Sequence, residues 1–162
     1  MTLRMAVAAG TIGAYGAVAK TEPDAFAAGR AAAAYALAAR RDSGSLAAAA
    51  ALTFAAPARA KADASRAGAA ALELAARASE LAPDDPAIGW LYLTLCAGAP
   101  SCDFRDAATN LRWVDAENAA AWLPTLTAAE RDKDVVQADR VLAAMAQGSR
   151  FDIYGNRLAV LV

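Results

Sequence analysis

Two cysteines, Cys96 and Cys102, are the residues of this chain whose type and spacing first suggest chemistry. A Cys-x-x-Cys pair at a helix N-terminus would indicate thiol–disulfide exchange, because that position lowers the thiol pKa. Here the cysteines are six positions apart, and neither lysine nor histidine adjoins them. They lie late in one expected helix and at the start of the next, where the Cα atoms come within the ~4.4–6.8 Å that a disulfide needs. We therefore predict a structural disulfide, with free thiols, a redox pair and a metal site as the alternatives.

Histidine is absent from the sequence. The chain thus lacks the commonest general base, the commonest zinc ligand and the usual partner of a nucleophilic Ser or Cys. Two cysteines also fall short of the four S or N ligands of a structural zinc site. The sequence predicts no metal, no cofactor and no enzymatic activity. The alternative is an enzyme that uses paired carboxylates or a buried arginine, which would need a concave pocket where these groups converge.

Acidic residues form four small clusters in the C-terminal half of the chain. Paired carboxylates can perform general acid–base catalysis or bind a hard cation. These clusters, however, fall at expected helix starts and turns, where Asp caps free backbone N–H groups and meets the positive end of the helix dipole. We interpret them as caps; they are Asp84 and Asp85, Asp103 and Asp106, Asp115 and Glu117, and Glu130, Asp132 and Asp134.

The elements that must position these residues are helices. Roughly a third of the chain is alanine, the residue with the highest helix propensity, whereas Val and Ile are sparse and no segment alternates apolar with polar residues. The prediction is one all-α domain over residues 1–162, an array of about eight to nine antiparallel helices. Residues 1–57 form Ala-rich N-terminal helices, and residues 58–162 form helical hairpins and a closing helix.

Pro, Gly and Asp mark the expected helix ends. A turn is predicted at residues 42–45, and a break at residues 148–152. The expected helices occupy residues 2–19, 22–41, 46–56, 58–82, 88–97, 103–114, 115–131, 135–147 and 153–162.

A repeat of 33 residues relates Pro83 to Ala116, since each follows one expected helix and precedes a turn and a Trp-containing helix. The segment before Pro83 has small residues at regular helical spacing, and Trp122 occupies the corresponding place after Ala116. Over roughly residues 58–148, this pattern resembles the tetratricopeptide-like superfamily of helical-hairpin repeats, whose period is ~34 residues. The residues that carry the resemblance are Ala71, Ala75, Ala78, Leu81, Pro83, Trp122 and Ala138.

The resemblance implies stacked helical hairpins with a concave, helix-lined face that binds a protein or peptide. Trp90 faces either the hairpin core or this concave face, depending on the register of its helix. On the concave face its indole would anchor a partner, because exposed aromatic side chains often dominate binding surfaces. The candidate partner-binding residues are Trp90, Thr94, Leu123, Thr127, Glu130 and Arg131.

The net charge of -1 and the pI near 5.4 give no electrostatic reason to expect nucleic acid as a partner. The apolar run at residues 46–60 is short and contains Pro57, so no membrane span is predicted. Residues 1–20 fit either a secretory signal or a first amphipathic helix. The predicted disulfide favours a periplasmic or exported protein, with a cytoplasmic one as the alternative.

Two functions follow from these observations. The first is a non-enzymatic interaction module, such as an exported scaffold or inhibitor, that binds a protein or peptide on a helix-lined face. The second is a structural subunit of a larger assembly, or a homo-oligomer formed through the Ala-rich N-terminal helices. Such helices carry few bulky apolar side chains of their own and are expected to need a neighbour that covers them.

Overall fold

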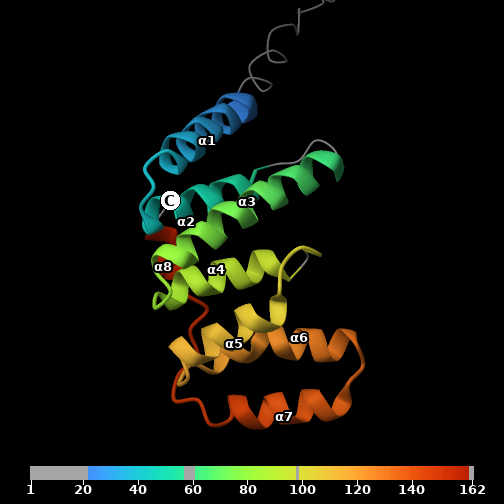
Figure 1. Ribbon diagram of the computed structural model, residues 1–162. Helices are drawn as coiled ribbons and strands as arrows, with labels where there is room; N and C mark the ends of the chain where they lie inside the picture. Colours follow the sequence, from blue (N-terminus) through green and yellow to red (C-terminus); the bar gives the residue numbers. More distant parts are fainter. Residues whose placement is uncertain (1–21, 57–60, 98, 161–162) are drawn as a thin grey trace, which may run out of the picture.

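A computed structural model describes residues 22–56, 61–97 and 99–160. In this part of the chain eight α-helices pack as sequential antiparallel pairs, and strands are absent (Figure 1). The all-α prediction is confirmed, while the predicted helix at residues 2–19 lies outside the described residues. The elements are α1 (Glu22–Ala38), α2 (Ser43–Phe54), α3 (Lys61–Leu81), α4 (Pro86–Cys96), α5 (Phe104–Val114), the 3₁₀ helix η1 (Ala119–Trp122), α6 (Leu123–Arg131), α7 (Val135–Met145) and α8 (Gly155–Val160).

Aspartate caps begin several helices, as the sequence predicted. The side chains of Asp85, Asp103 and Asp134 each accept a hydrogen bond from a backbone N–H in the first turn of the following helix. Asp42 does the same for α2, with a distance of 2.8 Å from its Oδ1 to the Ser45 nitrogen. The predicted turn at residues 42–45 was therefore wrong, because this cap starts the helix at Ser43.

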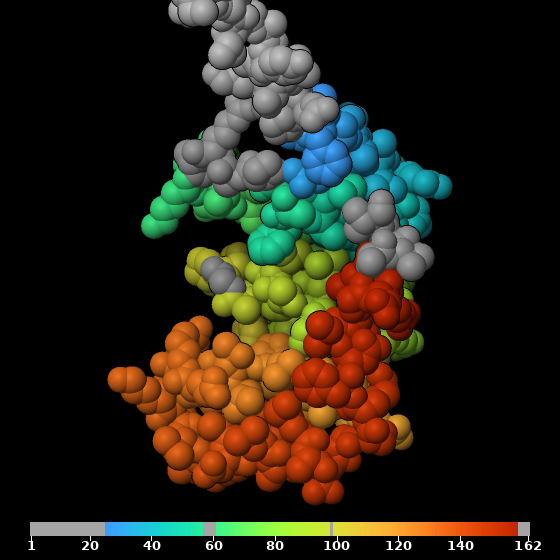
Figure 2. Space-filling model, turned by 180° about the vertical axis from the view of Figure 1, so that it is seen from behind, coloured from blue at the N-terminus to red at the C-terminus, as the bar shows by residue number. Residues whose placement is uncertain are grey.

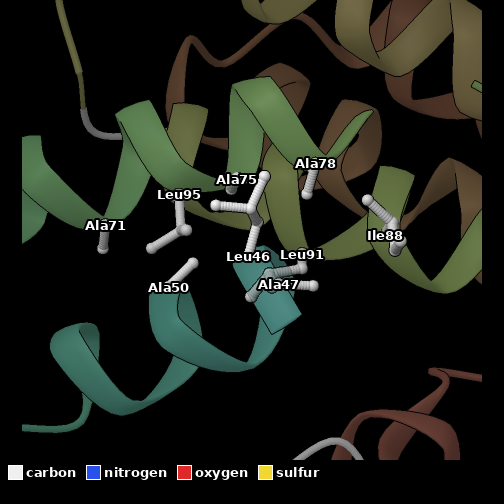
Figure 3. Close-up of a cluster of buried hydrophobic side chains, with 9 residues drawn as sticks. All are labelled: Leu46, Ala47, Ala50, Ala71, Ala75, Ala78, Ile88, Leu91 and Leu95. Atoms are coloured by element: carbon white, nitrogen blue, oxygen red, sulfur yellow. The ribbon is translucent and has the colours of Figure 1, made fainter. Parts of the chain in front are cut away.

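Alanine determines how closely the first helices pack. Three helices, α2, α3 and α4, meet in one apolar cluster (Figure 3). Its α3 members are alanines that expose none of their surface, so that helix lies close against both neighbours. The cluster consists of Leu46, Ala47, Ala50, Ala71, Ala75, Ala78, Ile88, Leu91 and Leu95.

A second apolar cluster joins α4 and α5 to η1. It consists of Leu93, Ala108, Leu111 and Ala121, and Trp90 and Phe104 pack against it. Gly89 of α4 faces this cluster, since a Cβ at this position would lie in ordinary van der Waals contact with Leu111 Cδ1, at 3.5 Å. The two clusters together hold α4 in place, and α4 provides one side of the candidate site.

In place of the single helix predicted at residues 115–131, the structure has a turn at residues 115–118 and two helices, η1 and α6. Asn118 caps η1 through its side chain, and Pro124 then lies in the first turn of α6. Proline fits a first turn because its missing N–H would have no intrahelical partner there. The break places Leu123, Thr127 and Arg131, three of the residues predicted to bind a partner, on a helix of their own.

The C-terminal segment returns along the stack instead of extending it. After α7 the chain passes η1 and runs back to α4, where α8 packs (Figures 1 and 2). The backbone nitrogen of Ala119 donates to the carbonyl of Arg150 at 2.9 Å, and Arg157 pairs with Asp85 at 3.1 Å. The predicted closing helix at residues 153–162 begins later in the structure, at Gly155, because Ser149 and Arg150 are hydrogen-bonded to the backbone of Glu117 and Ala119, and Tyr154 has a positive φ of 58°.

Candidate functional site: a hollow between α4 and α6

A cavity of about 440 Å³ lies between α4 and α6, and we call it the α4–α6 hollow. Carbon atoms form most of its surface. Five of the six predicted partner-binding residues line it, which brings together side chains from two helices about 30 positions apart in the sequence. The lining consists of Trp90, Thr94, Cys96, Ala97, Ala99, Phe104, Leu123, Pro124, Thr127, Ala128 and Arg131.

Trp90 is half-buried and lines one side of the hollow. Its indole packs against the ring of Tyr154, with 5.8 Å between the ring centroids and planes tilted by 52°. Such tilted aromatic contacts are stabilising and define the orientation of both rings. Tyr154, 64 positions further along the chain, therefore helps to orient this indole together with the cluster formed by α4, α5 and η1, and the sequence had left that orientation open.

Three residues of α6, Leu123, Thr127 and Arg131, face the hollow from the other side. They are spaced four residues apart, so they follow one another along a single helical stripe. Glu130 is exposed but does not line the hollow. Among the six predicted partner-binding residues it is thus the one that the structure places apart from the other five.

The Arg131 guanidinium gives the hollow its charged edge. Its Nε donates to Asp132 Oδ1 at 3.0 Å, and both side chains are exposed. The hydrogen bond from Arg131 lowers the pKa of Asp132, and the same bond raises the pKa of Arg131. A surface pair of this kind contributes little stability, so Arg131 can exchange this partner for the carboxylate of a ligand.

The predicted disulfide is present between Cys96 and Cys102, with 5.4 Å between the Cα atoms. Cys96 is buried and lines the hollow, while the Sγ of Cys102 lies 3.3 Å from the hydroxyl of Tyr92. Ala97 and Ala99 belong to the loop that the disulfide closes, and both lie at the edge of the hollow. The bond thus restrains one side of the site, and it is compatible with an oxidising compartment.

The second hollow, of about 680 Å³, lies against α5, α6 and the start of α7. It shares Phe104, Ala128 and Arg131 with the first hollow and adds two further arginines. Arg112 is engaged, since it donates to Thr125 at 2.7 Å and lies over the Trp122 ring at 4.7 Å, and burial lowers its pKa. Arg105 forms no ion pair with any described residue, and Asp132 and Asp134 line the same hollow, so this surface carries charges of both signs.

A buried polar network supports the site from behind Trp90. Asp115 is 6% exposed, Asn118 is fully buried, and Tyr154 is 1% exposed. The Tyr154 hydroxyl and the Arg150 guanidinium both donate to the Asp115 carboxylate. Asn118 Nδ2 donates to the Asp152 carbonyl at 2.7 Å and to the Tyr154 hydroxyl at 2.8 Å. The interpretation of Asp115 as a helix cap was wrong, because its carboxylate pairs with residues of the returning C-terminal segment.

The network also raises the pKa of Tyr154. Burial is the main cause, and the hydrogen bond to Asp115 adds to it, because both disfavour the phenolate form. Every buried side-chain nitrogen or oxygen among the described residues has a hydrogen-bond partner. The network therefore holds Tyr154, and through it Trp90, in one arrangement.

Sequence reasoning missed several lining residues, including Phe104, Pro124 and Ala128. Pro124 and Ala128 directly follow Leu123 and Thr127 in the sequence. A wider helical stripe, one residue broader than the one used to predict Leu123 and Thr127, would have included them. Phe104 comes from α5 and reaches the hollow because α5 packs against α4, next to the disulfide-closed loop. No pattern within α5 itself indicates that contact.

Comparison of the chain with known protein families, with curated proteins and with solved structures gives no match. No helix in the described ranges has both the length and the apolar character needed to cross a bilayer. Within the same residues, no three Cys, Asp or Glu side chains lie together as a metal site would require. The function must therefore be inferred from the α4–α6 hollow itself.

Proposed function

We propose that the chain is a non-enzymatic interaction module that binds a protein or peptide segment in the α4–α6 hollow. The observation that carries the proposal is the convergence of Trp90, Leu123, Thr127 and Arg131 around one largely apolar cavity. Binding sites of this kind combine an apolar floor with a few polar groups that orient the ligand. The groups that line this hollow suit an apolar side chain from the partner and, next to it, a carboxylate that meets Arg131.

We further propose that the hairpins are tetratricopeptide-like. The last residues of α3 and α5, Leu81 and Val114, are 33 positions apart, close to the ~34-residue period of such repeats. The small residues at Ala71, Ala75 and Ala78 are fully buried between helices, as the resemblance implies. On this assignment α4 and α6 are the first helices of successive hairpins, and a surface lined by first helices is the binding face that the resemblance implies.

The disulfide supports a location where thiols oxidise, and we propose that the protein is exported, for example to a periplasm. The second function, self-association or assembly through the Ala-rich N-terminal helices, stays a prediction. The alanines of α2 from Ala47 to Ala50 are buried inside the chain, so of the two described N-terminal helices α1 is the one that would provide that contact.

Selection of peptides from a random displayed library, followed by affinity measurements on matched variants, tests the binding proposal. Peptides selected on the wild-type chain should bind Trp90→Ala and Thr127→Trp at least tenfold more weakly, since the first removes the anchor and the second fills the hollow. Trp113→Ala is the matched control, because Trp113 is 82% exposed on α5 and lies outside the hollow. Equal binding to all four proteins, or selected peptides without apolar and acidic residues, would contradict the proposal.

A further inference from the structure

Helix α7 is the last helix of the stack, and only one of its sides is covered. Among the described residues it packs against α6 and η1, and no other helix lies on its outer side (Figure 1). By contrast, α2, α3 and α4 each pack between two neighbouring helices. The end helix of a stacked array normally has a polar outer face, because nothing in the chain covers it.

The outer face of α7 is instead largely apolar. Val135, Val136 and Leu142 are 70%, 61% and 50% exposed, and Ala143 beside them is exposed as well. We call this surface the end face; it comprises Val135, Val136, Asp139, Arg140, Leu142 and Ala143. An exposed apolar helix face bordered by polar residues is typical of a protein–protein contact.

The two charges of the end face occupy its middle. Asp139 and Arg140 are adjacent and exposed, and neither forms an ion pair with another described residue. The apolar residues lie on both sides of them along the helix. Along α7 the order is therefore apolar, Asp, Arg, apolar. An antiparallel copy of the same helix presents this order reversed, so that each Asp faces an Arg and each apolar end faces an apolar end.

From this pattern we infer that the end face binds a second copy of this chain, with the two α7 helices antiparallel about a two-fold axis. An axis between residues 139 and 140 places Asp139 of each copy opposite Arg140 of the other, which makes two equivalent ion pairs. The same symmetry places Val136 of each copy at the level of Ala143 of the other, and it places Val135 and Leu142 at the levels of Ala144 and Gln137. Both charges are thereby paired, and each apolar end lies against the opposite end of the other helix.

The dimer should be reversible and dependent on concentration. Helix α7 has 11 residues, so it is about 16 Å long. One such face is smaller than the ~800 Å² per partner of a standard stable interface. This contact is independent of the α4–α6 hollow, because no residue of the end face lines that hollow.

Sedimentation velocity over a range of concentrations, on the full chain and four variants, tests the inference. The wild type should form dimers of its 16.5 kDa monomer, and Leu142→Glu should weaken dimerisation at least tenfold. Asp139→Arg and Arg140→Asp should each do the same, because each places like charges opposite one another. Glu73→Arg, a charge reversal on the exposed surface of α3, is the control and should leave dimerisation unchanged.

Rescue distinguishes this contact from a general effect on folding. The double variant Asp139→Arg/Arg140→Asp should dimerise again, since the swapped charges pair in the same way. An equimolar mixture of the two single variants should also form a heterodimer, because the two ion pairs are restored between them. A wild type that stays monomeric, dimers that persist in Leu142→Glu, or failure of both rescues would overturn the inference.

Discussion

Replacement of Asn118 by alanine is expected to cost about 3–5 kcal/mol of unfolding free energy, because one buried amide joins η1 to the returning C-terminal segment. Asn118 Oδ1 accepts from the Ala120 nitrogen at 3.1 Å and from the Asp152 nitrogen at 2.9 Å. Its Nδ2 donates to the Asp152 carbonyl and to the Tyr154 hydroxyl. Each buried group left without a partner costs about 1–3 kcal/mol, and Ala120 is fully buried.

Urea denaturation monitored by far-UV circular dichroism measures this loss, and Asn110→Ala is the matched control. Asn110 is exposed on α5, so its replacement should change the unfolding free energy by less than about 0.5 kcal/mol. The nearly isosteric Asn118→Asp retains the Oδ1 acceptor but removes both donated bonds and adds a carboxylate near Asp115, so it too should be destabilised. An Asn118→Ala loss below 1 kcal/mol, comparable with that of the control, would refute the role of the network.

Three further perturbations test other parts of the structure. Gly148→Ala should lower the unfolding free energy by about 1–3 kcal/mol in urea denaturation, because the added Cβ would lie 2.9 Å from the Ala119 nitrogen. Gly68→Ala has nothing within 4 Å of its Cβ and should raise the unfolding free energy by about 0.5–1 kcal/mol, so equal effects of the two variants would contradict the close approach. Above pH 10 the unfolding free energy should fall by up to about 1.4 kcal/mol per pH unit, because the raised pKa of Tyr154 keeps a proton in the folded state that the unfolded chain releases. Tyr154→Phe should lack this part of the decline, and an equally steep decline in that variant would contradict the assignment to Tyr154. Double replacement of the cysteines by serine should lower the unfolding free energy by about 2 kcal/mol, and reduction of the wild type by a dithiol should do the same. Loss of the helical circular dichroism signal on reduction would contradict this magnitude.

The helices and the disulfide could be predicted because their causes are local. Alanine-rich segments between Pro, Gly and Asp form helices wherever they are placed, and Asp85, Asp103 and Asp134 cap them through bonds to residues two or three positions away. The cysteines are joined across one short loop, so their distance depends on little beyond the turn itself. The register of a single helix was also sufficient to select Leu123, Thr127 and Arg131 as a shared face.

Two of the errors, at residues 42–45 and 115–131, concern where a helix begins or breaks. The error at Asp115 has another cause, because a distant segment competes there with local preference. Its carboxylate is paired with Arg150 and Tyr154, which lie 35 and 39 positions away. Periodicity within a window of a dozen residues contains no information about such a pair.

The sequence by itself determined the helical class, the position of most helices, the disulfide and one stripe of the candidate site, because each of these depends on neighbours along the chain. Only the tertiary structure decided that the C-terminal segment turns back along the stack, that Tyr154 packs against Trp90, and that α7 keeps an uncovered apolar face. The physical reason is that these features depend on which surfaces remain to be buried after the hairpins have stacked. That outcome is a property of the whole packed chain and of no single segment.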